Sequence, residues 1–535
     1  MDKKFLIIGA VVIIAVIAGA FMLKGNSYHD DDPTHLVVAA HSNIKEPKAG
    51  FNPLTGWGCG HQNYNPLVQS CLFKTDSNGT IVPDIATDYS ISDDGKSWTV
   101  NLRNDIKFSD NSTLDADDVA FTFNKAKETE SELDLTNLAN ATVVNSTTVK
   151  FDLIEPRSTF IYDLRYVGIV PSDTYDNATY GEHPIGSGPY VLDHWDKGQQ
   201  AIFKINDNYY GDKPYFTQIT LVFPEESTWL ELAKSGDFDV VPVATSALNQ
   251  SVDGYQFVEK SAGRAQGVSL PYLPDTGIVT NDSYKVGNNV TSDKAIREAL
   301  NVGIDRNKMV DSVFAGHATP EFTGVDTRDY ANNASKVTDG DVQHAKKILE
   351  EGGWKDTDGD GIVEKNGTKA SFDLYYPPDY LDRQSLSTVF SEQAKDIGIE
   401  VNLKGADWDT IYANMYSSAA LMQQTSPDPY KSIYQQYHSK DMDGFYMNPN
   451  LYNNSDSDAL MEQAMHTNDF NQANNYWSQS ALVNDGGWGP AGDAPWVWLA
   501  NYDYNYHVKN GIDIGKQPDG LGNDILINIC EWKRA

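Results

Sequence analysis

The pattern of apolar and polar positions differs between the two halves of the chain. From residue 79 to residue 124, apolar side chains alternate with polar ones as in β-strands, most clearly in Trp98-Thr99-Val100-Asn101-Leu102. Asp94-Gly95, just before that run, predicts a hairpin turn, and Asp115 predicts the N-cap of a helix through Phe123. Further strands are expected near residues 147–154, 187–192, 201–206 and 217–224. The first half is therefore predicted to be a sheet-rich α/β body.

The second half alternates helices with strands. A helix capped by Ser292 or Asp293 is expected first, and a second one begins at Asp341 and ends at Gly352-Gly353. The pattern then predicts a strand, a helix, a strand, a helix and a short strand at residues 372–376, 385–397, 399–403, 408–416 and 420–422. Such alternation is typical of a parallel sheet with right-handed crossovers.

An uncharged apolar segment lies near the start of the chain. It runs for 19 residues from Phe5 to Leu23 and is flanked by lysines. A signal-peptide core has ~7–15 apolar residues and a bilayer crossing needs ~20, so we expect a retained membrane anchor. Ala18-Gly19-Ala20 would also permit cleavage, which is the alternative. The lysines before the segment place the rest of the chain outside the cytoplasm, on a polar tether.

Composition narrows the function classes. The chain has 535 residues and a formal net charge of -34, which argues against a nucleic-acid-binding protein. Its three cysteines exclude a disulfide framework. Eleven N-x-S/T sequons fit an external, glycosylated protein, or an Asn-rich surface that produces them by chance.

Motifs of common enzymes are missing from the sequence. There is no GxxxxGK[ST] phosphate loop, no HExxH and no GxSxG, so the chain is not predicted to be an enzyme. Asp356-Thr357-Asp358-Gly359-Asp360-Gly361 resembles the first half of a calcium loop, with Glu364 able to add one oxygen. The expected bidentate Glu is replaced by Gly367, so we favour a structural turn leading into the next strand, and no cofactor is expected.

Five blocks of sequence keep a common order along the chain. They are 83–119, 186–190 with 208–214, 225–239, 295–306 and 345–354 with the Asp/Gly turn after it. Over about residues 36–505 these blocks resemble the extracytoplasmic substrate-binding proteins of ABC importers, in the peptide/nickel-binding family 5. Asn111 departs from the usual Gly, but Asn tolerates positive φ.

The resemblance implies an α/β fold, a two-lobe periplasmic-binding-protein-like clamp of type II with an extra subdomain inserted in lobe one. The expected parts are an anchor, a tether, lobe one, lobe two and a return to lobe one, at residues 1–24, 25–35, 36–268, 269–497 and 498–535. The lobes are expected to close on a ligand as a monomer. The implied partners are a small-molecule ligand, the ABC permease and ATPase subunits, and the membrane through the N-terminal segment, but no nucleic acid.

The resemblance also suggests where a ligand lies. The loop of residues 56–64 places Trp57, His61 and Tyr64 where similar proteins have a ligand-facing loop, although a surface loop with a buried Trp is the alternative. Arg165-Tyr166 is in a segment that lines the cleft in similar proteins, so Arg165 could grip a carboxylate, or form a surface ion pair with Asp163. In lobe two, the candidates are Thr425, Asp428, Tyr430 and His438.

Two ligand classes remain open. Many peptide binders of the family carry an Asp that pairs the peptide ammonium, and here Thr425 or Gln424 takes its place, which weakens a simple dipeptide interpretation. Imidazole suits Ni²⁺, so His61 and His438 open a nickel-chelate alternative. The main hypothesis is a membrane-anchored receptor for short peptides. A surface sensor or adhesion protein with the same fold is a remote alternative, and an external hydrolase is a remoter one still.

Overall fold

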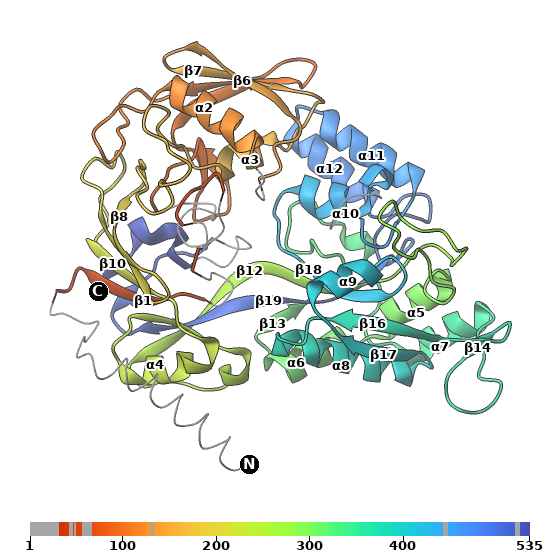
Figure 1. The fold of residues 1–535 in the computed structure, drawn as a ribbon. Helices are drawn as coiled ribbons and strands as arrows, with labels where there is room; N and C mark the ends of the chain where they lie inside the picture. Colours follow the sequence, from red (N-terminus) through yellow and green to blue (C-terminus); the bar gives the residue numbers. More distant parts are fainter. Residues whose placement is uncertain are drawn as a thin grey trace.

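The computed structural model describes residues 32–41, 46–47, 50–55, 67–129, 133–441, 448–518 and 525–535. Two α/β lobes lie side by side and are joined by the long strands β12 (Tyr255–Ser269) and β19 (Trp496–Lys509) (Figure 1). The predicted two-lobe clamp is confirmed. The predicted anchor at residues 5–23 lies outside the described residues. Among the described helices, none combines the length and apolarity that a membrane crossing requires.

An 11-stranded sheet runs through both lobes in the order β17-β16-β18-β12-β19-β11-β1-β10-β9-β8, with β13 beside β19. β1 and β10 are parallel, whereas β9 and β8 continue the sheet antiparallel. The strands on the lobe-one side are β1 (His35–Ala39), β8 (Tyr190–Asp196), β9 (Gln200–Ile205), β10 (Gln218–Val222) and β11 (Val240–Pro242). Helix α4 (Trp229–Ser235) packs against β11.

In lobe two, strands β16 (Ser371–Tyr376), β17 (Glu400–Gly405) and β18 (Ala419–Gln424) form the predicted parallel arrangement. Asp293 caps α5 and Asp341 caps α7, as the sequence indicated. The expected helix 385–397 is longer, because it begins at Leu381. The helices of this part are α5 (Lys294–Gly303), α6 (Arg306–Phe314), α7 (Val342–Glu351), α8 (Leu381–Asp396) and α9 (Trp408–Asn414).

The two long strands carry the connection between the lobes. β12 pairs with β18 through residues 265–269, and β19 pairs with β11 through residues 506–508. Their mutual ladder has register shifts between Lys260 and Arg264 and between Gln266 and Gly267. Short β13 (Ala318–Pro320) pairs with β19 from the lobe-two side. The predicted domain boundaries at 268/269 and 497/498 stay predictions.

A four-stranded antiparallel sheet forms the subdomain within lobe one, in the order β4-β5-β7-β6. Trp98 alternates into its core together with Val119 and Phe123 of α2, and Asp115 closes a capping box at that helix. Asn111 adopts φ 73°, so the predicted turn survives without Gly. The elements are β4 (Ala86–Ile91), β5 (Ser97–Leu102), α2 (Ala116–Lys127), β6 (Leu138–Asn145), β7 (Thr148–Leu153) and α3 (Phe160–Tyr166), with the small hairpin β2 (Phe73–Thr75) and β3 (Ile81–Pro83).

The outer end of lobe two faces this subdomain (Figure 1). It is built from α10 (Gln435–Tyr437), α11 (Ser455–His466) and α12 (Phe470–Ser480), and the last two helices pack on each other. The remaining short strands are β14 (Glu364–Lys365), β15 (Thr368–Lys369), β20 (Ile512–Asp513) and β21 (Lys533–Arg534).

Candidate functional site

The carboxyl ends of the parallel strands in both lobes carry polar and aromatic side chains. In open α/β sheets this edge is where ligands bind. In lobe two, Arg383 follows β16, Trp408 follows β17, and Gln423 is near the end of β18. In lobe one, His41 follows β1. The long strands between them add Arg264, so the two lobes contribute to one region beside the hinge.

Two buried guanidinium groups lie at the centre of this region. Arg264 Nε and Arg383 Nη2 both donate to Gln423 Oε1, at 3.2 Å and 2.7 Å. Arg264 is 5% exposed and Arg383 is 2% exposed. These side chains place two positive charges close to the hinge.

Aromatic rings flank the guanidinium groups of Arg264 and Arg383. The guanidinium carbon of Arg264 lies 4.7 Å from the ring centre of Tyr502, and that of Arg383 lies 5.1 Å from the ring of Trp408. Tyr502 also donates its hydroxyl to Asp382 at 2.5 Å. A flat aromatic face favours a cation above it, so the rings fix both arginines in orientation.

His41 brings the lobe-one side to the same place. Its ring is edge-on to Tyr504 at 4.5 Å and tilted against Trp229 at 4.9 Å. Burial, and then the charge of Arg264, hold the pKa of His41 well below its usual value. The imidazole is therefore neutral at pH 7.

A second cluster joins the lobes at the subdomain, far from His41 in the chain. Arg157, before α3, pairs through Nη1 with Asp163 at 3.0 Å and through Nη2 with Asp428 of lobe two at 3.3 Å. Its guanidinium carbon lies 4.2 Å above the ring of Tyr430. Burial raises the pKa of Asp163 to about 6 and also raises that of Asp428, with Arg157 opposing both shifts. This buried ion cluster spans the two lobes.

Further hydrogen bonds connect the two lobes at the same interlobe seam. Ser158 N donates to Met465 O at 2.9 Å, and Ser158 Oγ donates to Ala464 O at 2.8 Å. Gln435 Nε2 donates to Asp134 Oδ2 at 3.0 Å. The structure therefore has the subdomain and the outer end of lobe two in direct contact.

Beside this seam lies a cavity of about 530 Å³. Its walls come from both lobes, with Tyr89 and Ile161 on one side and Phe470 and Trp477 on the other. Tyr162 also lines it. The cavity is mostly apolar, so it can take apolar groups that enter between the lobes.

Two predicted residues lie on α3. Arg165 is buried and donates from Nη1 to Thr75 Oγ1 at 3.0 Å, while its guanidinium carbon lies 4.9 Å over the ring of Tyr162. The alternative of a surface ion pair with Asp163 is wrong, because Asp163 pairs with Arg157. The ammonium of Lys431 lies 5.8 Å from the ring of Tyr166, which brings Tyr166 next to lobe two.

The predicted lobe-two residues lie between β18 and α11. The carbonyl oxygen of Thr425 accepts a hydrogen bond from Arg328 Nη2 at 3.4 Å. Asp428 and Tyr430 belong to the ion cluster, and Asp428 Oδ1 also accepts from Tyr430 N at 2.9 Å. Asp428 and Tyr430 therefore contact lobe one through Arg157, whereas Thr425 contacts Arg328 of lobe two.

His438 packs within lobe two. It is 3% exposed, stacks on Tyr434 at 4.2 Å between ring centres, and has Nε2 3.2 Å from Glu462 Oε1. Burial lowers its pKa. Trp57, His61 and Tyr64 lie outside the described residues.

Four residues of these clusters were not predicted from the sequence: Arg157, Arg264, Arg383 and Gln423. Arg264 lies in the hinge strand β12, which also contains Glu259 and Lys260, so its charge alone does not distinguish it. Arg383 and Gln423 could have been found from their places near the ends of parallel strands. Arg157 carried no such signal, because its lobe-two partner is 271 positions away.

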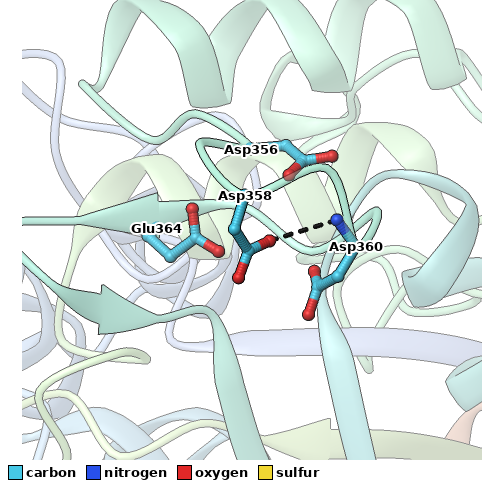
Figure 2. A group of neighbouring side chains, drawn as sticks. All are labelled: Asp356, Asp358, Asp360 and Glu364. Atoms are coloured by element: carbon cyan, nitrogen blue, oxygen red, sulfur yellow. Dashed lines mark hydrogen bonds between the residues drawn. The ribbon is translucent and has the colours of Figure 1, made fainter.

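The Asp/Gly turn brings together four carboxylates that could hold a cation. Oxygen atoms of Asp356, Asp358, Asp360 and Glu364 lie within 4.8 Å of one another (Figure 2). Hydrogen bonds also close the turn, since Asp356 accepts from Gly359 N and Gly361 N, and Lys369 pairs with Asp360 at 2.5 Å. The loop therefore combines the predicted turn with the oxygen donors that calcium prefers.

Comparisons with known proteins agree with this architecture. The chain is 29% identical to protein XP55 of Streptomyces lividans over 542 aligned residues, covering 98% of this chain and 94% of the relative. It is 27% identical to the oligopeptide-binding protein AppA of Bacillus subtilis, covering 83% of each. It is 28% identical to the nickel-binding periplasmic protein of Escherichia coli, covering 65% of this chain and 67% of the relative.

Solved structures share the fold. NikZ of Campylobacter jejuni, in complex with Ni(L-His), superposes with a TM-score of 0.75 at 21% identity, over 94% of this chain and all of that one. The model of the bacterial extracellular solute-binding proteins, family 5, matches residues 80–444. That match covers more than half of the sequence and includes all five blocks that carried the resemblance. The chain therefore belongs to the family 5 solute-binding proteins of ABC importers.

Proposed function

We propose that this solute-binding protein captures short peptides between its two lobes and delivers them to the permease of an ABC importer. The observation that carries the proposal is the region beside the hinge, where buried polar groups and aromatic rings from both lobes converge. A peptide site needs aromatic walls for side chains and a few fixed polar groups for the ends. The likeness to AppA over most of the chain supports the same solute class.

Native mass spectrometry of the purified protein, combined with metal analysis, tests this proposal. Peptide masses that co-purify without metal are the expected result. Stoichiometric nickel without peptide would contradict it. The Arg103→Met variant, in which a partly exposed arginine that pairs with Asp105 is changed, is a control that should retain the same ligand.

A nickel chelate is the second candidate, and one residue favours it. Thr425 or Gln424 stands where many peptide binders have a carboxylate for the peptide ammonium, and Asp428 is held by Arg157. The likeness to the E. coli nickel-binding protein supports this alternative. Nickel that is bound by the wild type and lost in the His61→Ala variant would favour the chelate over the peptide.

We also propose that the N-terminal segment anchors the protein to the membrane on the extracytoplasmic face, that the body is a monomer, and that sequons on it are glycosylated. The uncharged stretch from Phe5 to Leu23 supports the anchor. Fractionation of cells should recover the full-length chain with the membrane, and deletion of residues 1–24 should release it. Light scattering tests the monomer, and a glycosidase-dependent mass shift tests the glycans.

A further inference from the structure

An exposed apolar hairpin in lobe two carries a sequon at its turn. Ile278, Val279 and Tyr284 are 61%, 53% and 36% exposed. The sequon that begins at Asn281 lies between them in the chain. We infer that Asn281 is a site of N-glycosylation and that its glycan covers these three apolar side chains. The inference rests on the proposed glycosylation and deepens it, because it assigns one acceptor residue and gives its glycan a role.

Backbone hydrogen bonds hold the sequon at the tip of the hairpin. Ser283 N donates to Thr280 O, and Thr280 N donates to Tyr284 O, both at 2.9 Å. Asn281 and Asp282 are therefore the two central residues of a turn, and both are exposed. An asparagine in such a position is accessible to an enzyme that acts on the folded surface.

The hairpin lies away from the binding region. Directly after it, Asn288 Nδ2 donates to Ser417 O at 3.1 Å. Ser417 comes just before β18, whereas Gln423 is near the other end of this strand, beside the hinge. A glycan at Asn281 would therefore leave the region between the lobes open to the solute.

The fold leaves the side-chain nitrogens of the sequon asparagines free. All eleven of these asparagines are exposed, whereas most of the other asparagines that the structure describes are buried or half-buried. Asn140 Nδ2 donates to Thr142 Oγ1, within its own sequon, at 2.8 Å. Nδ2 of the other sequon asparagines donates to no group in the described part of the chain. This nitrogen is the atom that a glycan is attached to.

Pairs of adjacent asparagines provide a matched comparison. Asn289, Asn333 and Asn453, which begin sequons, are each next to an asparagine that does not, namely Asn288, Asn332 and Asn454. In all three pairs the asparagine outside the sequon donates from Nδ2 to an oxygen atom distant in the chain, at 2.8–3.1 Å. Its neighbour makes no such bond to the described residues. A surface that produced sequons by chance would not divide its asparagines in this way.

A second exposed apolar side chain also lies beside a sequon. Val144 is 57% exposed, and Asn145 follows it directly. Both are on β6, an edge strand of the subdomain sheet. Exposed edges and apolar patches promote association with other chains. A glycan at Asn145 would cover Val144 as the glycan at Asn281 covers the hairpin.

The attachment is a group transfer from an activated sugar. Asn281 Nδ2 attacks the anomeric carbon of an oligosaccharide that is linked to a lipid through phosphate. The bond between that carbon and the phosphate oxygen breaks, the phosphate leaves with the bonding electrons and the lipid, and the amide loses one proton. The C–H faces of the attached sugar can then lie against Tyr284 and its aliphatic neighbours, while the sugar hydroxyls stay in water.

Mass spectrometry of peptides tests the site on protein purified from the cells that naturally produce it. The peptide that contains Asn281 should carry a glycan, and Asn281→Gln should lose it. Ser283→Gly keeps the asparagine but removes the sequon, so it should lose the glycan as well. Ser283 has φ 67°, which glycine adopts without strain, so the turn is preserved in this variant.

Hydrophobic-interaction chromatography tests the role of the glycan. Asn281→Gln should elute later than the wild type, because its apolar hairpin is uncovered. Changing Ile278 and Val279 to Thr in that variant should restore the elution, which a folding defect would not allow. Asn249→Gln is the matched control, because no large apolar side chain next to Asn249 in the chain is exposed, and it should elute like the wild type.

The outcomes separate this inference from the proposals on which it rests. Glycans on other sequons but not on Asn281 would overturn the inference and leave the proposed glycosylation standing. A glycan on Asn281 whose loss does not delay elution would overturn its covering role. The absence of glycans from every sequon would overturn both the site and the proposed glycosylation. Asn281→Gln should co-purify with the same solute as the wild type, so solute capture is tested separately.

Discussion

Replacing Asp428 by Asn should weaken the contact between the lobes. Asn keeps the size of the side chain and the Oδ1 acceptor that receives Tyr430 N, so the local turn is preserved. The change removes the negative charge 3.3 Å from Arg157 Nη2. Asp163 still neutralises Arg157, so no buried cation is abandoned. The loss is then that of one charged hydrogen bond, about 1.5–3 kcal/mol.

This loss belongs to the closed arrangement, because the two partners come from different lobes. At ~1.4 kcal/mol per tenfold change, the ratio of closed to open molecules should fall about ten- to a hundredfold. Distances between spin labels on α2 and α11 report the two populations, and the apparent affinity for the solute should fall by the same factor when closure is required for binding.

A surface pair serves as the matched control. Lys347 and Glu351 on α7 are 3.6 Å apart and both well exposed, so Glu351→Gln should change neither the label distances nor the affinity. Unchanged distances and affinity in the Asp428→Asn variant would refute the reasoning. A double-mutant cycle with Arg157→Met should give a coupling of similar size, and a coupling near zero would refute it equally.

Three other properties follow from buried or crowded groups. Burial, and then the charge of Asp326, raise the pKa of Glu321, so the folded state holds a proton that the unfolded state has lost and the free energy of unfolding falls as pH rises above ~4.3. Glu321→Gln should therefore be more stable than the wild type at pH 8 and equal to it at pH 4 in urea unfolding, and a gain that grows toward acid would be inconsistent with this sign. Gly186→Ala should cost several kcal/mol, roughly 3 or more, because a Cβ would lie 1.9 Å from a backbone oxygen, whereas Gly198→Ala, with open space around it, should cost ~1 kcal/mol. The turn at residues 356–361 is closed by its own hydrogen bonds, so millimolar calcium should leave Tm unchanged, and a rise that is lost on Asp358→Asn would show a cation site instead.

Local signals predicted much of the fold. Asp115 and Asp341 were identified as helix caps from residue type and position, and both cap helices through their side chains. The parallel strands of lobe two followed from alternation of apolar runs with helices. The start of α8 was placed too late, because Ser385 is a typical cap residue whereas the actual cap position, Tyr380, offers no side-chain signal.

The site was less accessible to this reasoning, since it depends on contacts across long stretches of chain. Asp428 was placed correctly in the interlobe region by its motif, but nothing local indicates that its partner is Arg157. Arg165 shows the converse, because its position on α3 was recognised while its side chain turns toward Thr75 within the subdomain. Residue type and spacing therefore identify the segment that faces the other lobe, and only packing decides which side chain of that segment does so.

Two connections join the lobes: the long strands β12 and β19, and the contact of the Arg157 cluster with lobe two. Figure 1 shows α3, which follows Arg157 in the chain, well away from β12 and β19. With both connections in place, the two lobes would surround a bound solute, and the distance between the connections would limit its length. Because the Arg157 contact is far from the hinge strands, a rotation at those strands displaces it much more than it displaces the residues beside the hinge. A solute that is too long would therefore first prevent the Arg157–Asp428 contact from forming, while the end of the solute beside the hinge stayed bound.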